Sequence, residues 1–156
     1  NRSNSPQSLN SKKHQREEKY HSRYEILPIT YWSRTEECLD AKHKHIEKID
    51  HLCDSRERLV LYTTLYNRRV ALEKNMFPYD TPHGVEHYTL WSRYDMSHAE
   101  ICRFVDNWIS RRMPHVRRWN YDDNAGDKSI ELFHVHVYIE TIPFAYQPTK
   151  EAETTH

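Results

Sequence analysis

The segment FHVHVYI, residues 133–139, decides the fold that this sequence predicts. Apolar and polar side chains alternate along it with the period of two that is typical of a β-strand, so successive side chains point to opposite faces of a sheet. The two faces consist of Phe133, Val135, Val137 and Ile139 on one side and Leu132, His134, His136 and Tyr138 on the other. We expect the first face to pack on helices and the second to place two histidines roughly 6–7 Å apart along the strand.

The chain before this strand switches irregularly between helical and extended patterns. Ser33, Asp54 and Ser97 each begin an N-cap pattern that is followed by apolar residues at helical intervals. The predicted helices span residues 34–53, 55–74 and 98–112. The predicted extended segments span residues 24–29, 85–91, 116–121 and 129–139, and a turn is predicted over 122–127. This order favours an α+β fold, in which a small antiparallel sheet has its helices packed on one face.

Length and composition indicate one domain with polar ends. A chain of 156 residues is typical of a single domain, which we expect to span residues 19–146. Residues 1–18 contain almost nothing apolar and are expected to be a disordered N-terminal arm, and residues 147–156 a C-terminal tail. Such arms often order on a partner, so a protein partner that binds through these ends is one expectation.

Charge and cysteine content narrow the functional classes. The 23 Lys and Arg residues balance the 23 Asp and Glu residues, so nucleic acid is not an expected ligand. No segment approaches the roughly 18 apolar residues of a membrane span, and the two glycines are too few for the usual glycine-rich phosphate loop. The three cysteines are odd in number and lie in helical patterns, which predicts reduced thiols in an intracellular, cytoplasmic protein.

The two histidines of the last strand have three interpretations. The first is a half-exposed strand whose histidines have no chemical role. The second is a nucleotide or phosphate site in which one imidazole is the nucleophile or the general acid or base. The third is a metal site in which His83 and His87 complete the ligand set of His134 and His136.

A basic cluster, RRMPHVRR at residues 111–118, is a second candidate for phosphate binding. Its arginines have the geometry to clamp a phosphate group. The alternative is that Arg111 and Arg112 end a helix, where positive charge is favoured, and that Arg117 and Arg118 follow on a solvated strand edge.

Residues 77–93, FPYDTPHGVEHYTLWSR, resemble the signature of a largely fungal family that is known only as a domain of unknown function. The later pieces Trp119-Asn120, Lys128–Ile130 and His134–Val137 resemble the closing segment of the same family. The resemblance covers about residues 20–140 and implies the α+β fold rather than an activity.

A more distant resemblance is to the histidine-triad nucleotide hydrolases and transferases, whose last motif is a turn, a serine and alternating histidines on a strand. Counting from Ser129, Leu132 stands at the first triad position, His134 at the nucleophile position and His136 at the third. The resemblance implies a histidine-triad-like fold with a nucleotide or phosphoester pocket.

These patterns lead to one working hypothesis and one alternative. The hypothesis is a nucleotide or phosphoester binding and hydrolysis domain that requires no metal or cofactor. His134 and His136 are its expected catalytic residues, and its expected substrate-binding residues are Ser129, Asn120, Arg117, Arg118 and His87. The alternative is a non-catalytic interaction module, or a subunit of a larger assembly, that binds through the terminal arms.

Overall fold

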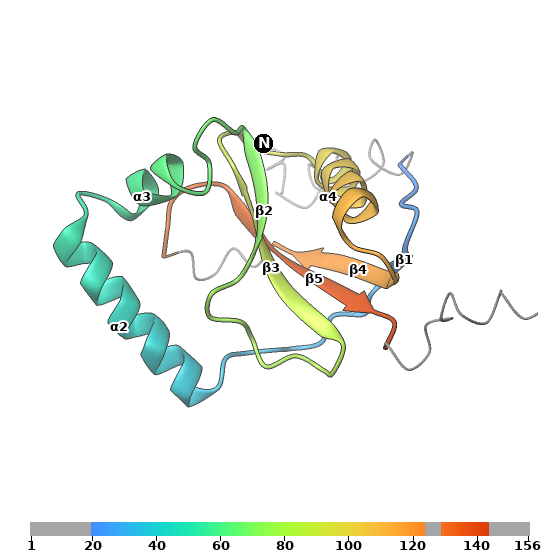
Figure 1. The fold of residues 1–156 in the computed structure, drawn as a ribbon, viewed down its shortest axis with the longest axis horizontal. Coiled ribbons are helices and arrows are strands. Elements are labelled where there is room, and N and C mark those ends of the chain that lie inside the picture. Colours follow the sequence, from blue (N-terminus) through green and yellow to red (C-terminus); the bar gives the residue numbers. More distant parts are fainter. Residues whose placement is uncertain (1–19, 124–128, 144–156) are drawn as a thin grey trace, which may run out of the picture.

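A computed structural model describes residues 20–123 and 129–143 of the chain (Figure 1). The strands are β1 (Glu25–Ile26), β2 (Val70–Lys74), β3 (Val85–Ser92), β4 (Val116–Asp122) and β5 (His134–Thr141). The helices are α2 (Glu36–Leu52), α3 (Arg56–Tyr62) and α4 (His98–Arg112). The predicted arm 1–18 and tail 147–156 lie outside the described residues. Within the described part, no helix is both long and apolar enough to cross a lipid bilayer.

The five strands form one sheet in the order β1-β4-β5-β3-β2. The strand that carries both histidines, β5, lies at the centre and is antiparallel to β3 and to β4. The pair β1–β4 is parallel and short, so the sheet is mixed rather than purely antiparallel. The α+β class and the small sheet are therefore confirmed.

Helix α4 covers the apolar face of the sheet (Figure 1). Val135, Val137 and Ile139 of β5 are all buried there, against Ile101 and Val105 of α4. The side-chain alternation predicted for β5 is confirmed, because the apolar side chains face the helix and the histidines face the other way. The capping box of α4, formed by the Ser97 and Glu100 side chains, sets the predicted start of this helix.

The histidine face also has helices over it, contrary to the prediction that all helices pack on one face. Helix α3 packs there through Val60, which forms a cluster with Leu65 and Ala71 and with the half-buried Trp91 and Leu132. Helix α2 lies on the same side, farther from the sheet (Figure 1). Near α3 the histidine face carries the apolar side chains of Ala71, Trp91 and Leu132. Val60 of α3 is buried against them, which removes apolar surface from water.

The predicted helix 55–74 is wrong beyond its first two turns. Helix α3 ends at Tyr62, and Asn67, with a φ of 54°, reverses the chain before β2. Residues 70–74 then pair with β3 in antiparallel register, Leu72 opposite Leu90. A helical period also fits the apolar stripe, but pairing with β3 selects a strand, which buries Ala71 and Leu72 on opposite faces of the sheet.

The last strand begins at His134 rather than at residue 129. The Ser129 carbonyl accepts a hydrogen bond from the Arg56 side chain of α3, and the Glu131 backbone N–H donates to the Glu57 carboxylate. These bonds hold residues 129–131 against α3 and away from the β-ladder.

A buried carboxylate ties the start of the described chain to the core. Asp106 of α4 is fully buried and accepts hydrogen bonds from the Tyr20 hydroxyl, the Ser22 hydroxyl and the Arg23 backbone N–H. It also accepts one from the indole Nε1–H of Trp119 in β4, at 2.8 Å. Four donors around one carboxylate offset the cost of burying it.

Replacing Asp106 with Ala leaves these donors without their acceptor, so we expect the free energy of unfolding to fall by about 2–4 kcal/mol. Urea denaturation monitored by tryptophan fluorescence measures the change. The matched control is Asp95→Ala at an exposed position, which should change stability by less than about 0.5 kcal/mol. Equal effects of the two substitutions would contradict the anchoring role of Asp106.

Candidate functional site

A cavity of about 270 Å³ lies between the histidine face of the sheet and helices α2 and α3. Both predicted catalytic residues, His134 and His136, line it, and so does Ser129. Further lining side chains come from α2, α3 and the segment after β2; among them are Lys42, Ile46, Ile49, Leu59, Thr63, Asn75, Phe77, Tyr79 and Trp91. The structure thus forms a small, partly aromatic cavity around the histidine pair.

Helix α2 forms the outer wall of the cavity without burying any of its own residues. Its start is fixed by the Thr35 hydroxyl, which caps the Cys38 N–H, and by a contact of the Cys38 Sγ with the Pro78 carbonyl at 3.4 Å. His45 contacts Phe77 with ring centroids 5.3 Å apart. These contacts connect α2 to the loop after β2 rather than to the sheet itself.

His134 is oriented by a backbone carbonyl. Its Nδ1 lies 2.7 Å from the Leu132 carbonyl oxygen. Since a carbonyl oxygen only accepts, Nδ1 carries the proton, and in the neutral ring the lone pair is on Nε2. The ring also packs on Trp91, with centroids 4.7 Å apart. This is the tautomer that a nucleophile or general base acting through Nε2 requires.

His136 is held by a second histidine behind it. Its Nδ1 lies 2.6 Å from Nε2 of His87, and the Nδ1 of His87 accepts a hydrogen bond from the Tyr79 backbone N–H at 3.0 Å. The Tyr79 ring stacks on His136, with ring centroids 5.3 Å apart. The predicted substrate-binding residue His87 is therefore placed behind His136 and outside the cavity lining.

Burial keeps His87 uncharged. The side chain is 2% exposed, and its burial, followed by the neighbouring His136 and Arg34, lowers its pKa from 6.5 to about 3. A neutral His87 whose Nδ1 accepts from Tyr79 carries its proton on Nε2.

Basic side chains surround the cavity, but they differ from those predicted. Arg34 donates to the Phe77 carbonyl at 2.6 Å and lies over the Tyr79 ring. Arg56 pairs with Asp50 through two hydrogen bonds of 2.8 and 2.7 Å. Lys42 and Lys74 also line the cavity, as does one carboxylate, Glu73, so basic side chains outnumber acidic ones in the lining although Arg56 is paired with Asp50.

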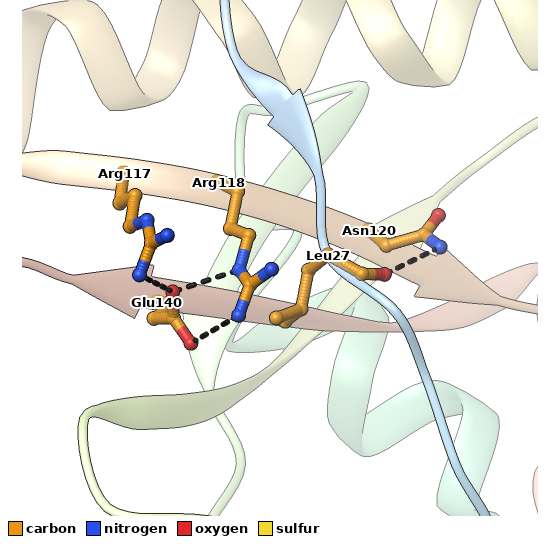
Figure 2. A network of polar contacts seen from close by, with 5 residues as sticks. All are labelled: Leu27, Arg117, Arg118, Asn120 and Glu140. Atoms are coloured by element: carbon orange, nitrogen blue, oxygen red, sulfur yellow. Dashed lines mark hydrogen bonds and ion pairs between the residues drawn. The ribbon is translucent and has the colours of Figure 1, made fainter.

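The predicted phosphate ligands on β4 lie farther along the histidine face, with Arg118 opposite Glu140 and Asn120 opposite Tyr138 of β5. Figure 2 shows their polar contacts. Arg118 makes two hydrogen bonds to Glu140 of β5, at 2.8 and 3.2 Å, and Arg117 lies 3.7 Å from the same carboxylate. The Asn120 side chain donates to the Leu27 carbonyl. None of the three β4 residues lines the cavity, because the chain around Leu27 and Trp32 packs on Tyr138 between them and the histidines.

Arg111 and Arg112 lie in the last turn of α4, on the opposite side of the sheet. Their positive charges interact favourably there with the negative end of the helix dipole. The structure therefore separates them from Arg117 and Arg118, which the sequence placed in one cluster.

The metal interpretation finds no support in the arrangement of side chains. Within residues 20–123 and 129–143, no three His, Cys, Asp or Glu side chains are grouped in a way that could hold a metal ion. His83 is exposed on the loop before β3 and does not line the cavity.

Several cavity residues could not be assigned from the sequence. Tyr79 and Trp91 fall within the segment that resembles the fungal family, which was the one available signal for them. Arg34 precedes helix α2 and Lys42 lies within it. The polar pattern of this segment predicts only contact with solvent. The cavity arises because α2 lies over the histidine face, which the sequence did not predict.

No family model and no curated protein matches this chain. A solved crystal structure of HTC1 is similar over 95% of this chain and 88% of that chain, with 18% sequence identity and a TM-score of 0.49. The function of the chain therefore has to be inferred from the geometry of the cavity.

The low pKa of His87 predicts an acid-sensitive stability. Below about pH 6.5 the unfolded chain binds a proton at His87 that the folded chain binds only near pH 3. Stability should thus fall as the pH decreases through this window, by up to about 1.4 kcal/mol per pH unit from this group. Urea unfolding at a series of pH values should give a shallower decline for His87→Gln than for the wild type. His83→Gln, at an exposed position, should keep the wild-type slope; identical slopes for all three would contradict the assignment.

Proposed function

We propose that this domain binds a nucleotide or a related phosphoester in the cavity and hydrolyses it with His134. The observation that carries the proposal is the hydrogen bond from His134 Nδ1 to the Leu132 carbonyl, on a ring that lines the cavity. This bond leaves the lone pair on Nε2, which suits attack on phosphorus or removal of a proton from water.

The surroundings of His134 support this class of ligand. Trp91, Phe77 and Tyr79 provide flat apolar surface against which a base ring can pack, and all three line the cavity. Arg34 and Lys42 provide positive charge at the same walls, while Arg56 is paired with Asp50 and Glu73 adds one negative charge. A cavity of about 270 Å³ is slightly below the usual range for small-molecule sites, so a mononucleotide-sized group is a better match than a larger ligand.

The proposed reaction on a nucleoside phosphoramidate proceeds in two steps. The Nε2 lone pair of His134 forms an N–P bond while the P–N bond of the substrate breaks, and the leaving amine takes a proton from water, which leaves a hydroxide. A hydroxide oxygen then attacks phosphorus, the electrons of the His134 N–P bond return to Nε2, and a nucleoside monophosphate is released with the neutral histidine restored. In the general-base form of the mechanism, His134 instead takes a proton from the attacking water.

The non-catalytic interaction module remains the second hypothesis from the sequence. Its supporting features, residues 1–18 and 147–156, lie outside the described residues. A histidine face covered by a partner chain would favour that hypothesis, whereas here the covering elements are α2 and α3 of the same chain. The cavity geometry therefore favours a small ligand.

The test uses adenosine 5′-phosphoramidate and a dinucleotide as substrates, with product release followed by phosphorus NMR. We expect the wild type to turn over at least one of them and His134→Ala to lose about 100-fold or more of the rate. AMP binding, measured by calorimetry, should change by no more than a few-fold in His134→Ala.

His83→Ala is the matched control, because His83 is an exposed histidine outside the cavity lining. It should retain wild-type turnover and AMP binding. Absence of both turnover and AMP binding in the wild type would sink the proposal.

A further inference from the structure

We propose that His87 is a positioning residue that fixes His136 as a neutral hydrogen-bond donor with its proton on Nε2. The two histidines of β5 then have opposite roles, His134 accepting a proton and His136 donating a hydrogen bond. The ligand class inferred from this pairing rests on the proposed function. The proton positions rest only on the hydrogen bonds of the histidines.

The proton positions follow from a hydrogen-bond chain that starts at the backbone. The Tyr79 N–H can only donate, so the Nδ1 of His87, 3.0 Å away, is unprotonated. A neutral His87 therefore carries its proton on Nε2 and donates it to the Nδ1 of His136 at 2.6 Å. The Nδ1 of His136 is then an acceptor, and the neutral His136 ring carries its proton on Nε2.

The same chain opposes a positive charge on His136. A second proton on His136 would occupy Nδ1 and point at the Nε2–H of His87. His87 could yield only by moving its proton to Nδ1, where it would meet the Tyr79 N–H. His87 is also buried, with its pKa lowered to about 3, so it does not take up a proton in exchange.

Aromatic packing holds the rings in the orientation that the chain needs. Tyr79 stacks on His136 with ring centroids 5.3 Å apart and planes 21° apart. Tyr138 stacks on the other histidine, His87, at 4.9 Å and 23°. A 180° flip of either ring would keep its plane but put carbon atoms where these hydrogen bonds need nitrogen, which makes one arrangement dominant.

In His134 the positions of the proton and the lone pair are reversed relative to His136. The Nδ1 of His134 donates to the Leu132 carbonyl at 2.7 Å, and that hydrogen bond is kept when Nε2 gains a proton. The hydrogen bond at the Nδ1 of His134 is therefore compatible with a second proton on that ring, whereas the hydrogen bond at the Nδ1 of His136 is not.

Other charged and titratable groups also act on the histidine pair, from each element around it. They are Lys42 and His45 from α2, Arg56 from α3, Glu73 and Lys74 from β2, Arg34 and Tyr79 from the loops, Asp122 opposite His136 on β4, and His87 on β3. The contact that sets the proton position on His136 is the hydrogen bond between its Nδ1 and the Nε2 of His87, at 2.6 Å.

The pairing of one acceptor with one donor defines the ligand. Both β5 rings line the cavity, with centroids 6.2 Å apart, so one small ligand can contact both. The matching ligand presents an oxyanion oxygen to the Nε2–H of His136 and a water or hydroxyl proton to the Nε2 of His134. A phosphoryl oxygen with an adjacent water has this pattern, and so His136 steadies the phosphoryl group rather than acting as the general acid.

The experiment is long-range proton–nitrogen NMR of the ¹⁵N-labelled full chain at about pH 7 without ligand, with His134→Gln and His136→Gln used to assign the two ring signals. We expect the Nε2–H tautomer for His136 and the Nδ1–H tautomer for His134. A proton on the Nδ1 of His136, or a charged His136 at this pH, would overturn the inference, and the wild-type spectrum alone decides it.

Two variants at position 87 separate positioning from packing. In His87→Gln the amide nitrogen can replace Nε2 as the donor to His136, so His136 should keep its Nε2–H tautomer. In His87→Leu the donor is lost, and His136 should become a mixture of tautomers. The same His136 signal in both variants would contradict a positioning role.

Addition of AMP, with adenosine as the control lacking the phosphoryl group, tests the ligand class. AMP should shift the His136 Nε2–H signal, and adenosine should shift it little. If the tautomers are as expected but AMP moves neither histidine signal, the proposed function fails while the role of His87 stands. If AMP binds but His136 has the other tautomer, the role of His87 fails instead.

Discussion

Every second side chain of β5 packs against α4, and this constraint fixes where the remaining side chains of the strand must lie. Val135, Val137 and Ile139 are held in the largest buried cluster, so His134 and His136 cannot turn inward without exposing it. The central place of β5 between β3 and β4 fixes its register on both sides. A slip of one residue would exchange the core face for the histidine face, which the apolar cluster forbids.

The polar side of the sheet is arranged by satisfying buried hydrogen-bonding groups. His87 is almost fully buried on this side and has a partner at each ring nitrogen, one a backbone N–H and the other His136. Glu140, at the far end of β5, is satisfied in the same way by Arg117 and Arg118. The face is thereby divided between an ion-paired end near β1 and an aromatic, histidine-containing end beneath α2 and α3.

The sequence predicted those features that depend on local pattern. Alternation located β5 and its two faces, and the capping boxes located α2 and α4 to within two residues. Features that depend on tertiary pairing were missed: residues 70–74 have an apolar stripe that a helix or a strand could use, and β3 selected the strand. The sequence likewise predicted that His134 and His136 share one pocket, and both line the cavity. It could not predict that Arg34 rather than Arg118 lies beside them, because that depends on how residues 27–34 cross the sheet.

Helix α2 has 17 residues and none of them is buried, although it forms one wall of the cavity. Its backbone hydrogen bonds are therefore protected from solvent exchange mainly by the helix itself, whereas those of β5 are protected by the whole core. Amide hydrogens of α2 should exchange with solvent through local opening that leaves the sheet intact. The histidines thus lie on a central strand beneath a helix that buries none of its residues, so local opening of α2 would leave the geometry of the cavity floor unchanged.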